Sequence, residues 1–222
     1  EQDSDEYGEL FFEYLCYMHD HRVDPAFISI GLAGGLKDGR YVLEWTDPRM
    51  EKFLFERGQC RFLIGAGPPG LSREGLAKEQ YEEYVRQYLR QVIAHARESG
   101  WYERLSFTGA VDEPQTKKEY EAVRYWAELI HSVDPRVPVA VTEQPIPDKT
   151  AWGTLVGYCS EWIVHGNVLD KNREAIAARQ AAGERVSWYI SCDQLYPQPN
   201  YYIDRSAADC RMISWITWRY RL

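Results

Sequence analysis

Two adjacent carboxylates, Asp112 and Glu113, directly follow an apolar run of strand length at residues 105–111 and precede Pro114. In parallel α/β folds the reacting groups lie at the carboxyl ends of strands, so chemistry is expected at this position. Repulsion between neighbouring carboxylates favours keeping one of them protonated near neutral pH. A proton donor beside an anion is the combination that glycoside cleavage uses. The competing interpretation is that one of these acids only caps a helix predicted to begin near Thr116.

The ends of other predicted strands carry polar and aromatic side chains as well. Sugar rings stack on aromatic faces and hydrogen-bond to carboxylates, amides and hydroxyl groups, so a cleft of this composition suits a carbohydrate. Taken singly, each residue is also explained by loop polarity or by core filling. The candidate substrate-binding residues are Glu143, His165, Trp188, Tyr189, Asn200 and Tyr201, and the same segments also contain Gln144, Trp162, Asn167 and Asp193.

Other chemistries have weaker support. Residues 19–22 read His-Asp-His-Arg, but two histidines at a spacing of two with no third ligand do not predict a metal site. We expect Arg22 to lie near the carbohydrate site or to belong to a helix-to-loop cap. The glycine-rich segments 31–35 and 65–70 match neither a dinucleotide-binding nor a phosphate-binding motif, and no nucleophile elbow supports serine catalysis. No metal and no cofactor is therefore predicted.

Composition sets further limits on the kind of protein. Of the 222 residues 45% are hydrophobic and 27% are charged, which is typical of a folded globular chain. Mean hydropathy is −0.52, and no apolar run is long enough to cross a bilayer. The net charge is −8, and the basic residues are scattered, so a nucleic-acid partner is not expected. The five cysteines form no CxxC and predict free, mostly buried thiols.

Apolar runs of strand length recur along the chain, and they predict six buried strands. Segments with helical spacing lie between them. The clearest is residues 76–99, where apolar positions recur at steps of three and four residues and Gly100 closes the helix. Thr116 and Glu119 have the form of a capping box for a second helix. The predicted strands are residues 26–30, 62–66, 105–111, 137–142, 161–165 and 186–191, and the other predicted helices are 7–20, 170–183 and from 204 or 206 to the end.

Alternating strands and helices with short links predict right-handed crossovers and a parallel sheet, that is, an α/β fold. The spacing of the strands suits a TIM-like (β/α)-barrel with a hairpin inserted at residues 39–45. A complete barrel has eight strands and usually needs about 250 residues. We therefore expect residues 1–222 to form a single, incomplete barrel domain that has about six of eight core strands and lacks the first and last. A neighbouring segment or domain would complete it.

Several segments match one known family in consistent order. They are Phe-Thr-Gly-Ala-Val-Asp-Glu-Pro at residues 107–114, His-Asp-His-Arg-Val-Asp-Pro at 19–25, the strand 183–189 that leads to Cys192 and residues 197–201, and Arg211 with Trp215. Together they resemble the catalytic domain of glycoside hydrolase family 123. The resemblance covers nearly the whole chain at low identity. It implies a (β/α)-barrel enzyme that acts as a retaining exo-β-N-acetylgalactosaminidase.

The resemblance also implies roles for the acid pair. In substrate-assisted catalysis the 2-acetamido oxygen of the sugar attacks the anomeric carbon, which is an exception to the scheme with two catalytic carboxylates. Asp112 would orient the acetamido N–H and offset the charge of the oxazolinium-like intermediate. Glu113 would be the general acid and then the general base. Both carboxylates reach one sugar only if the backbone leaves strand geometry, a departure that Pro114 favours.

Two rival interpretations stay open at this point. Family 20 β-N-acetylhexosaminidases also place an Asp-Glu pair at the end of a barrel strand, although the later segments favour family 123. A non-catalytic carbohydrate-binding or scaffold domain would preserve the same barrel-like pattern. The predicted partner is a carbohydrate for the enzymes and for a binding module, and for the enzymes it is an N-acetylhexosaminide.

Overall fold

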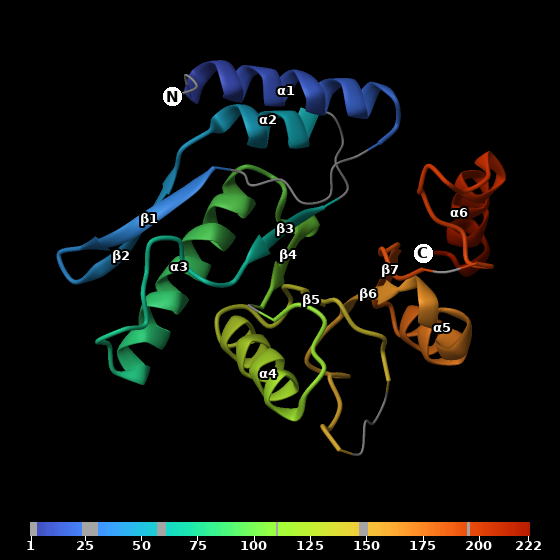
Figure 1. Cartoon of the computed structure of the whole chain (residues 1–222). Helices are drawn as coiled ribbons and strands as arrows, with labels where there is room; N and C mark the ends of the chain where they lie inside the picture. The colour runs from blue at the N-terminus through green and yellow to red at the C-terminus, as the bar shows by residue number, and fades with distance from the viewer. Residues whose placement is uncertain (1–3, 24–30, 57–60, 110, 147–150, 195) are drawn as a thin grey trace. The chain divides into compact units, whose positions relative to one another are not determined.

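The computed structural model describes residues 4–23, 31–56, 61–109, 111–146, 151–194 and 196–222. Contacts divide the chain into two compact units (Figure 1). The first holds Glu1–Phe107 and Leu129–Val137, and the second holds Thr108–Glu128 and Pro138–Leu222. Each unit buries apolar side chains of its own. Among the described residues, no helix is long and apolar enough to span a membrane.

The first unit opens with α1 (Ser4–Asp20), which packs on α2 (Pro48–Glu56). In the chain, the two helices are separated by an antiparallel hairpin of β1 (Leu32–Lys37) and β2 (Arg40–Trp45). Asp38 and Gly39, which join the strands, both have positive φ, of 50° and 73°. This is the backbone geometry that a two-residue hairpin turn needs, and Asp-Gly is a sequence that adopts it. The hairpin predicted at residues 39–45 is confirmed in part, because the observed hairpin also includes β1, which was not predicted. Helix α2 was not predicted either.

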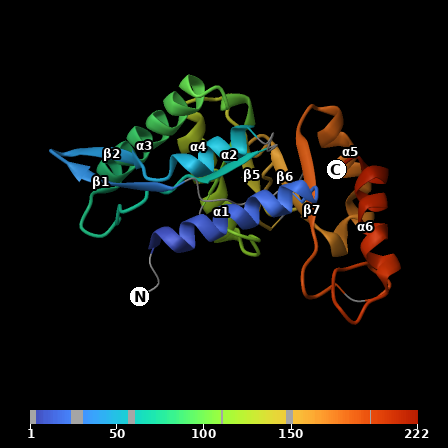
Figure 2. The ribbon, with the colours of Figure 1, turned by 90° about the horizontal axis from the view of Figure 1, so that it is seen from above.

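Helix α3 (Lys78–Glu98) lies along the hairpin (Figure 2). Its side-chain amides bond the backbone of β2. Gln87 accepts from the N–H of Tyr41 at 2.8 Å, and Gln91 accepts from the N–H of Leu43 at 3.0 Å. The Gln91 amide also donates to the carbonyl of Tyr41 at 2.9 Å. The edge of β2 is thus hydrogen-bonded by a helix.

The periodicity that predicted a helix over residues 76–99 is confirmed by α3. Seven of its residues are buried, and they fall at the spacing of one helical stripe: Tyr84, Val85, Tyr88, Leu89, Val92, Ile93 and Ala96. Gly100 follows with a φ of 78°, which is the left-handed conformation expected beyond a helix end. Local sequence alone therefore determines where this helix lies and which face it buries.

A five-stranded sheet is the main β structure, and its strands follow one another in chain order. They are β3 (Phe62–Gly65), β4 (Leu105–Thr108), β5 (Val139–Val141), β6 (Glu161–His165) and β7 (Arg185–Tyr189). The pairs β5–β6 and β6–β7 are parallel. The mixed α/β class and the parallel sheet agree with the sequence prediction. The predicted strand at residues 26–30 lies outside the described residues, and closure into a single barrel domain stays a prediction.

The helices of the second unit begin close to their predicted positions. Helix α4 (Lys117–His131) follows Thr116, and α6 (Ala207–Tyr220) follows Ser206. Helix α5 (Arg173–Ala181) begins later than predicted, because residues Asp170–Asn172 form a separate 3₁₀ turn. The expectation of mostly buried thiols is wrong for the four described cysteines, of which only Cys159 is buried.

Candidate active site

The acid pair lies in the connection between β4 and α4, and both carboxylates are exposed. Helix α4 is capped by other residues. The Thr116 hydroxyl donates to Glu119 at 2.9 Å, and the N–H of Glu119 donates back to Thr116 at 3.3 Å. This is the predicted capping box. Asp112 and Glu113 are therefore not the cap of this helix, which removes the competing explanation for the pair.

The backbone leaves strand geometry at Glu113, where φ is 45°. A non-glycine residue in this left-handed region costs about 1–3 kcal/mol and persists only where surrounding contacts hold it. Thr142, which directly follows β5, supplies such contacts. The N–H of Glu113 donates to the Thr142 hydroxyl at 2.7 Å, and that hydroxyl donates to Asp112 Oδ1 at 2.6 Å. One threonine side chain therefore joins the backbone of one acid to the carboxylate of the other.

Tyr189, the last residue of β7, donates its hydroxyl proton to Glu113 Oε1. Burial raises the pKa of Tyr189, and the hydrogen bond to Glu113 with the charges of Glu113, Asp112 and Asp193 raises it further. The phenol therefore remains a proton donor throughout the neutral range. Tyr189 contacts the acid pair as the strand-end argument predicted, and its role in binding stays a prediction.

His165, the last residue of β6, packs edge-on against the ring of Tyr189 with centroids 4.9 Å apart. Its Nδ1 accepts from the N–H of Asn167 at 3.2 Å, so the proton of the neutral ring lies on Nε2. Nε2 then donates to Asp193 Oδ1 at 3.0 Å. The Asn167 amide donates to Asp193 Oδ2 at 3.0 Å. These three residues, the His165–Asn167–Asp193 cluster, join the end of β6 to the loop after β7.

Glu143 is 4% exposed and is bonded inside the second unit. It accepts from the Tyr120 hydroxyl at 2.8 Å and from the N–H of Gln144 at 2.9 Å. Burial raises the pKa of Tyr120, and the hydrogen bond to Glu143 adds to this effect. Glu143 directly follows Thr142 in the chain, but these contacts turn its carboxylate inward. Substrate binding by Glu143 stays a prediction.

The remaining predicted site residues lie in different surroundings. Trp188 alternates with Tyr189 on β7, and its indole N–H donates to Thr217 on α6 at 2.8 Å. Asn200 is 1% exposed and bonds the carbonyl of Gln194 and the N–H of Tyr202, which stabilises the loop after β7. Tyr201, in the same loop, is 65% exposed. Arg22 is exposed and belongs to the first unit. Among the contacts of the described residues, none joins Trp188, Asn200 or Tyr201 to the acid pair, and substrate binding by these residues and by Arg22 stays a prediction.

Sequence reasoning missed Thr142 and the pairing of Asp193 with Asn167. Asn167 and Asp193 were visible as polar residues at strand ends. Thr142 was assigned to a strand, although β5 ends at Val141. Within the described residues, no three side chains of His, Cys, Asp or Glu gather closely enough to hold a metal ion.

A sequence model for the glycoside hydrolase 123 catalytic domain matches residues 72–222, which include the acid pair and every residue bonded to it. The chain belongs to glycoside hydrolase family 123. A comparison of this chain with curated proteins found no match. A solved structure that shares its fold is a family 123 glycoside hydrolase from Clostridium perfringens, described in connection with glycolipid glycan hydrolysis, with a TM-score of 0.62 at 11% identity.

The match to the Clostridium perfringens enzyme covers 86% of this chain and 40% of the longer one. This family 123 chain therefore spans less than half of that neighbour. An endo-1,4-β-mannanase from Rhizomucor miehei is less similar, with a TM-score of 0.43 and 9% identity. That match covers 86% of this chain and 75% of the mannanase.

Proposed function

We propose that this chain is the catalytic part of a retaining exo-β-N-acetylgalactosaminidase that works through the 2-acetamido group of its substrate. Family membership supports hydrolysis of a glycoside. The observation that carries the proposal is the exposed acid pair itself. Its two carboxylates are bonded by Thr142 and Tyr189, which come from two other strand ends, while other residues cap the following helix.

Glu113 is assigned as the general acid and base. A protonated carboxyl group has one O–H, and Oε1 already accepts from Tyr189. The acid proton therefore belongs on Oε2, the oxygen that would face the leaving group. As the proton moves to the glycosidic oxygen, Glu113 becomes a carboxylate and its bond from Tyr189 gains charge assistance. In the second half-reaction the same carboxylate takes a proton from water.

Asp112 is assigned to the acetamido group. The Thr142 hydroxyl donates to Oδ1, so that oxygen is occupied as an acceptor and its negative charge is favoured. Oδ2 would accept the acetamido N–H and turn the acetamido oxygen toward the anomeric carbon. Attack by that oxygen closes a positively charged oxazolinium ring, whose charge the nearby carboxylate offsets.

Hydrolysis of two chromogenic substrates tests the proposal. We expect release of the aryl group from an N-acetyl-β-galactosaminide at a higher kcat/KM than from the matching glucosaminide. An Asp112→Asn, Glu113→Gln double variant is the control for contaminating activity. Activity on neither sugar, with sugar binding retained, would instead support a carbohydrate-binding module.

The barrel is part of the same proposal. We propose that both units belong to one (β/α)-barrel domain and that a neighbouring segment or domain completes it. The neighbour from Clostridium perfringens is much longer than this chain, which is consistent with additional chain in the working enzyme. Hydrolysis by this chain when it is expressed alone would show that no such segment is needed for activity.

A further inference from the structure

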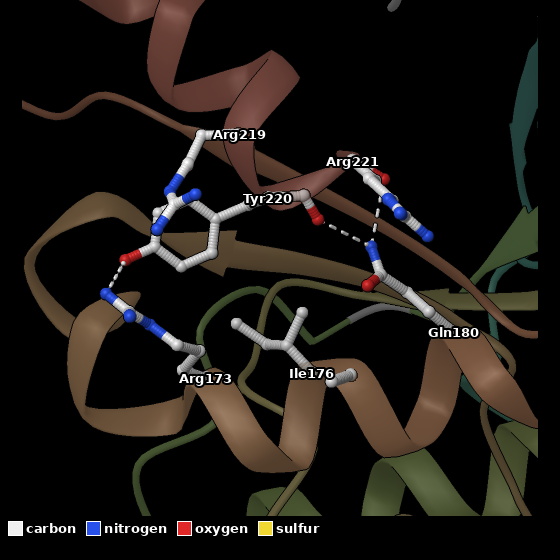
Figure 3. Close-up of a pocket in the computed structure, with 7 residues that line it drawn as sticks. Arg173, Ile176, Gln180, Arg219, Tyr220 and Arg221 are labelled. Carbon is white, nitrogen blue, oxygen red and sulfur yellow. Dashed lines mark hydrogen bonds between the residues drawn. The ribbon is translucent and has the colours of Figure 1, made fainter.

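A cavity of about 250 Å³ lies between α5 and the last turn of α6 (Figure 3). Its lining combines basic and polar side chains with a larger share of apolar surface, and none of it belongs to the acid pair. One stripe of α5 supplies Arg173, Ile176, Ala177 and Gln180, and the end of α6 supplies Arg219, Tyr220 and Arg221. Ile176 is 1% exposed and therefore belongs to the core beneath the cavity.

Hydrogen bonds hold the two walls of the cavity together. Gln180 on α5 donates to the carbonyls of Tyr220 and Arg221 at 3.1 and 2.9 Å. At the other end, Arg173 donates to the Tyr220 hydroxyl at 2.9 Å, as Figure 3 shows. The Tyr220 hydroxyl in turn donates to Asp170. The cavity is therefore shaped by fixed contacts before any ligand arrives.

Three arginines line this small volume in a chain whose net charge is −8. Arg173 is 2.9 Å from Asp170 and shares its charge with that carboxylate. The guanidinium groups of Arg219 and Arg221 form no ion pair or hydrogen bond with any residue that the structure describes. All three arginine side chains are exposed, so their N–H donors are accessible to a ligand.

We propose that this cavity binds a sulfate or phosphate group, as the free ion or as an ester on a sugar. Guanidinium groups bind such oxyanions with paired N–H donors, and a tetrahedral anion presents oxygens to donors from two helices at once. A carboxylate is flat and is matched by a single arginine. The volume accommodates the anion together with at most a small part of the molecule that carries it. Because the site uses no residue of the acid pair, it does not depend on the proposed hydrolysis.

Calorimetric titration of inorganic phosphate into the whole chain at low ionic strength tests this site. We expect one bound ion per chain. Arg219→Gln should raise Kd about tenfold, as expected from the loss of one charge-assisted hydrogen bond. Lys171→Gln is the matched control, since Lys171 is an exposed cation in the turn before α5 and does not line the cavity. Equal weakening by both variants would mean that phosphate responds only to overall charge, and it would overturn the proposal.

A second variant strengthens binding and is therefore informative even if the arginine variant folds poorly. Asp170→Asn removes the carboxylate that competes for Arg173, so Kd for phosphate should fall several-fold. An unchanged or higher Kd in Asp170→Asn contradicts the site. A sulfated N-acetylhexosamine is titrated beside its unsulfated form to separate the two sources. Preference for the sulfated sugar over phosphate identifies an ester as the ligand, and the reverse order identifies the free ion. Binding of neither probe by the unaltered chain refutes the proposal.

Discussion

Tyr189→Phe tests whether the tyrosine acts through Glu113. The change removes the hydroxyl that donates to Glu113 and retains the ring that packs on His165. In the proposed mechanism Glu113 is neutral before proton transfer and negative after it, so the hydrogen bond is stronger in the transition state than in the ground state. A hydrogen bond contributes about 0.5–1.5 kcal/mol when its acceptor is neutral and about 1.5–3 kcal/mol when it is ionised, so the difference of about 1–1.5 kcal/mol corresponds to a loss of about 5- to 13-fold in kcat/KM.

The assay compares an alkyl N-acetylhexosaminide with an aryl glycoside that has a good leaving group. The loss should be large for the alkyl substrate and small for the aryl one, because an aryl leaving group needs little proton donation. In a Glu113→Gln background, Tyr189→Phe should add almost nothing, since glutamine never becomes a carboxylate. Tyr196→Phe is the control, because Tyr196 is 80% exposed and lies in the same unit.

Two results would refute this reasoning. Equal slowing of both substrates would mean that Tyr189 acts on the sugar and not on the acid. If the loss of kcat/KM in the double variant equalled the product of the losses in the two single variants, Tyr189 and Glu113 would not be coupled.

Three other predictions follow from the described contacts. Glu113→Gln should slow alkyl glycosides by about 10²–10⁴-fold and spare activated aryl ones, whereas Asp112→Asn should slow both; the reverse pattern in steady-state kinetics would exchange their roles. The hydrogen bond from the N–H of Gln115, and to a smaller extent the one from the Thr116 hydroxyl, lower the pKa of Glu119 below 4.5. These bonds therefore stabilise the folded chain above pH 4.5, and that stabilisation is lost as pH falls through the pKa of Glu119 in the folded state. Thermal melts should therefore show a steeper acid loss in the unaltered chain than in Glu119→Gln. Leu89→Ala, at a residue 0% exposed in α3, should cost about 2–5 kcal/mol in urea unfolding, against little for the exposed Arg90→Ala; similar small costs would contradict the packing of α3.

The elements that local sequence specifies were predicted well. The stripe of α3 and the capping box of α4 depend on residues three and four positions apart, so one segment contains the whole signal. Helix α2 (Pro48–Glu56) was not predicted. The start of α5 was misplaced because Asp170 resembles a cap, whereas its carboxylate bonds Arg173 and Tyr220.

The candidate site was predictable in part. The acid pair was found from its position after an apolar run, which is a local feature. A departure from strand geometry at Glu113 was expected, but its left-handed φ was not, because a residue before proline is biased toward extended backbone. The contact that holds its left-handed φ comes from Thr142, 29 residues further along the chain. The partners of Asp193 are likewise 26 and 28 residues away, and only the folded sheet brings them together.

The two glutamines of α3 that bond β2 have a consequence for solubility. An exposed strand edge presents unpaired N–H and C=O groups, and another extended chain can add to it. Gln87 and Gln91 occupy those groups at Tyr41 and Leu43 with side-chain amides, so the helix takes the place that a third strand would fill. Leucine at either position would preserve helical propensity and volume, yet it would leave the strand open to self-association. These half-buried polar residues of α3 thus protect the hairpin against aggregation.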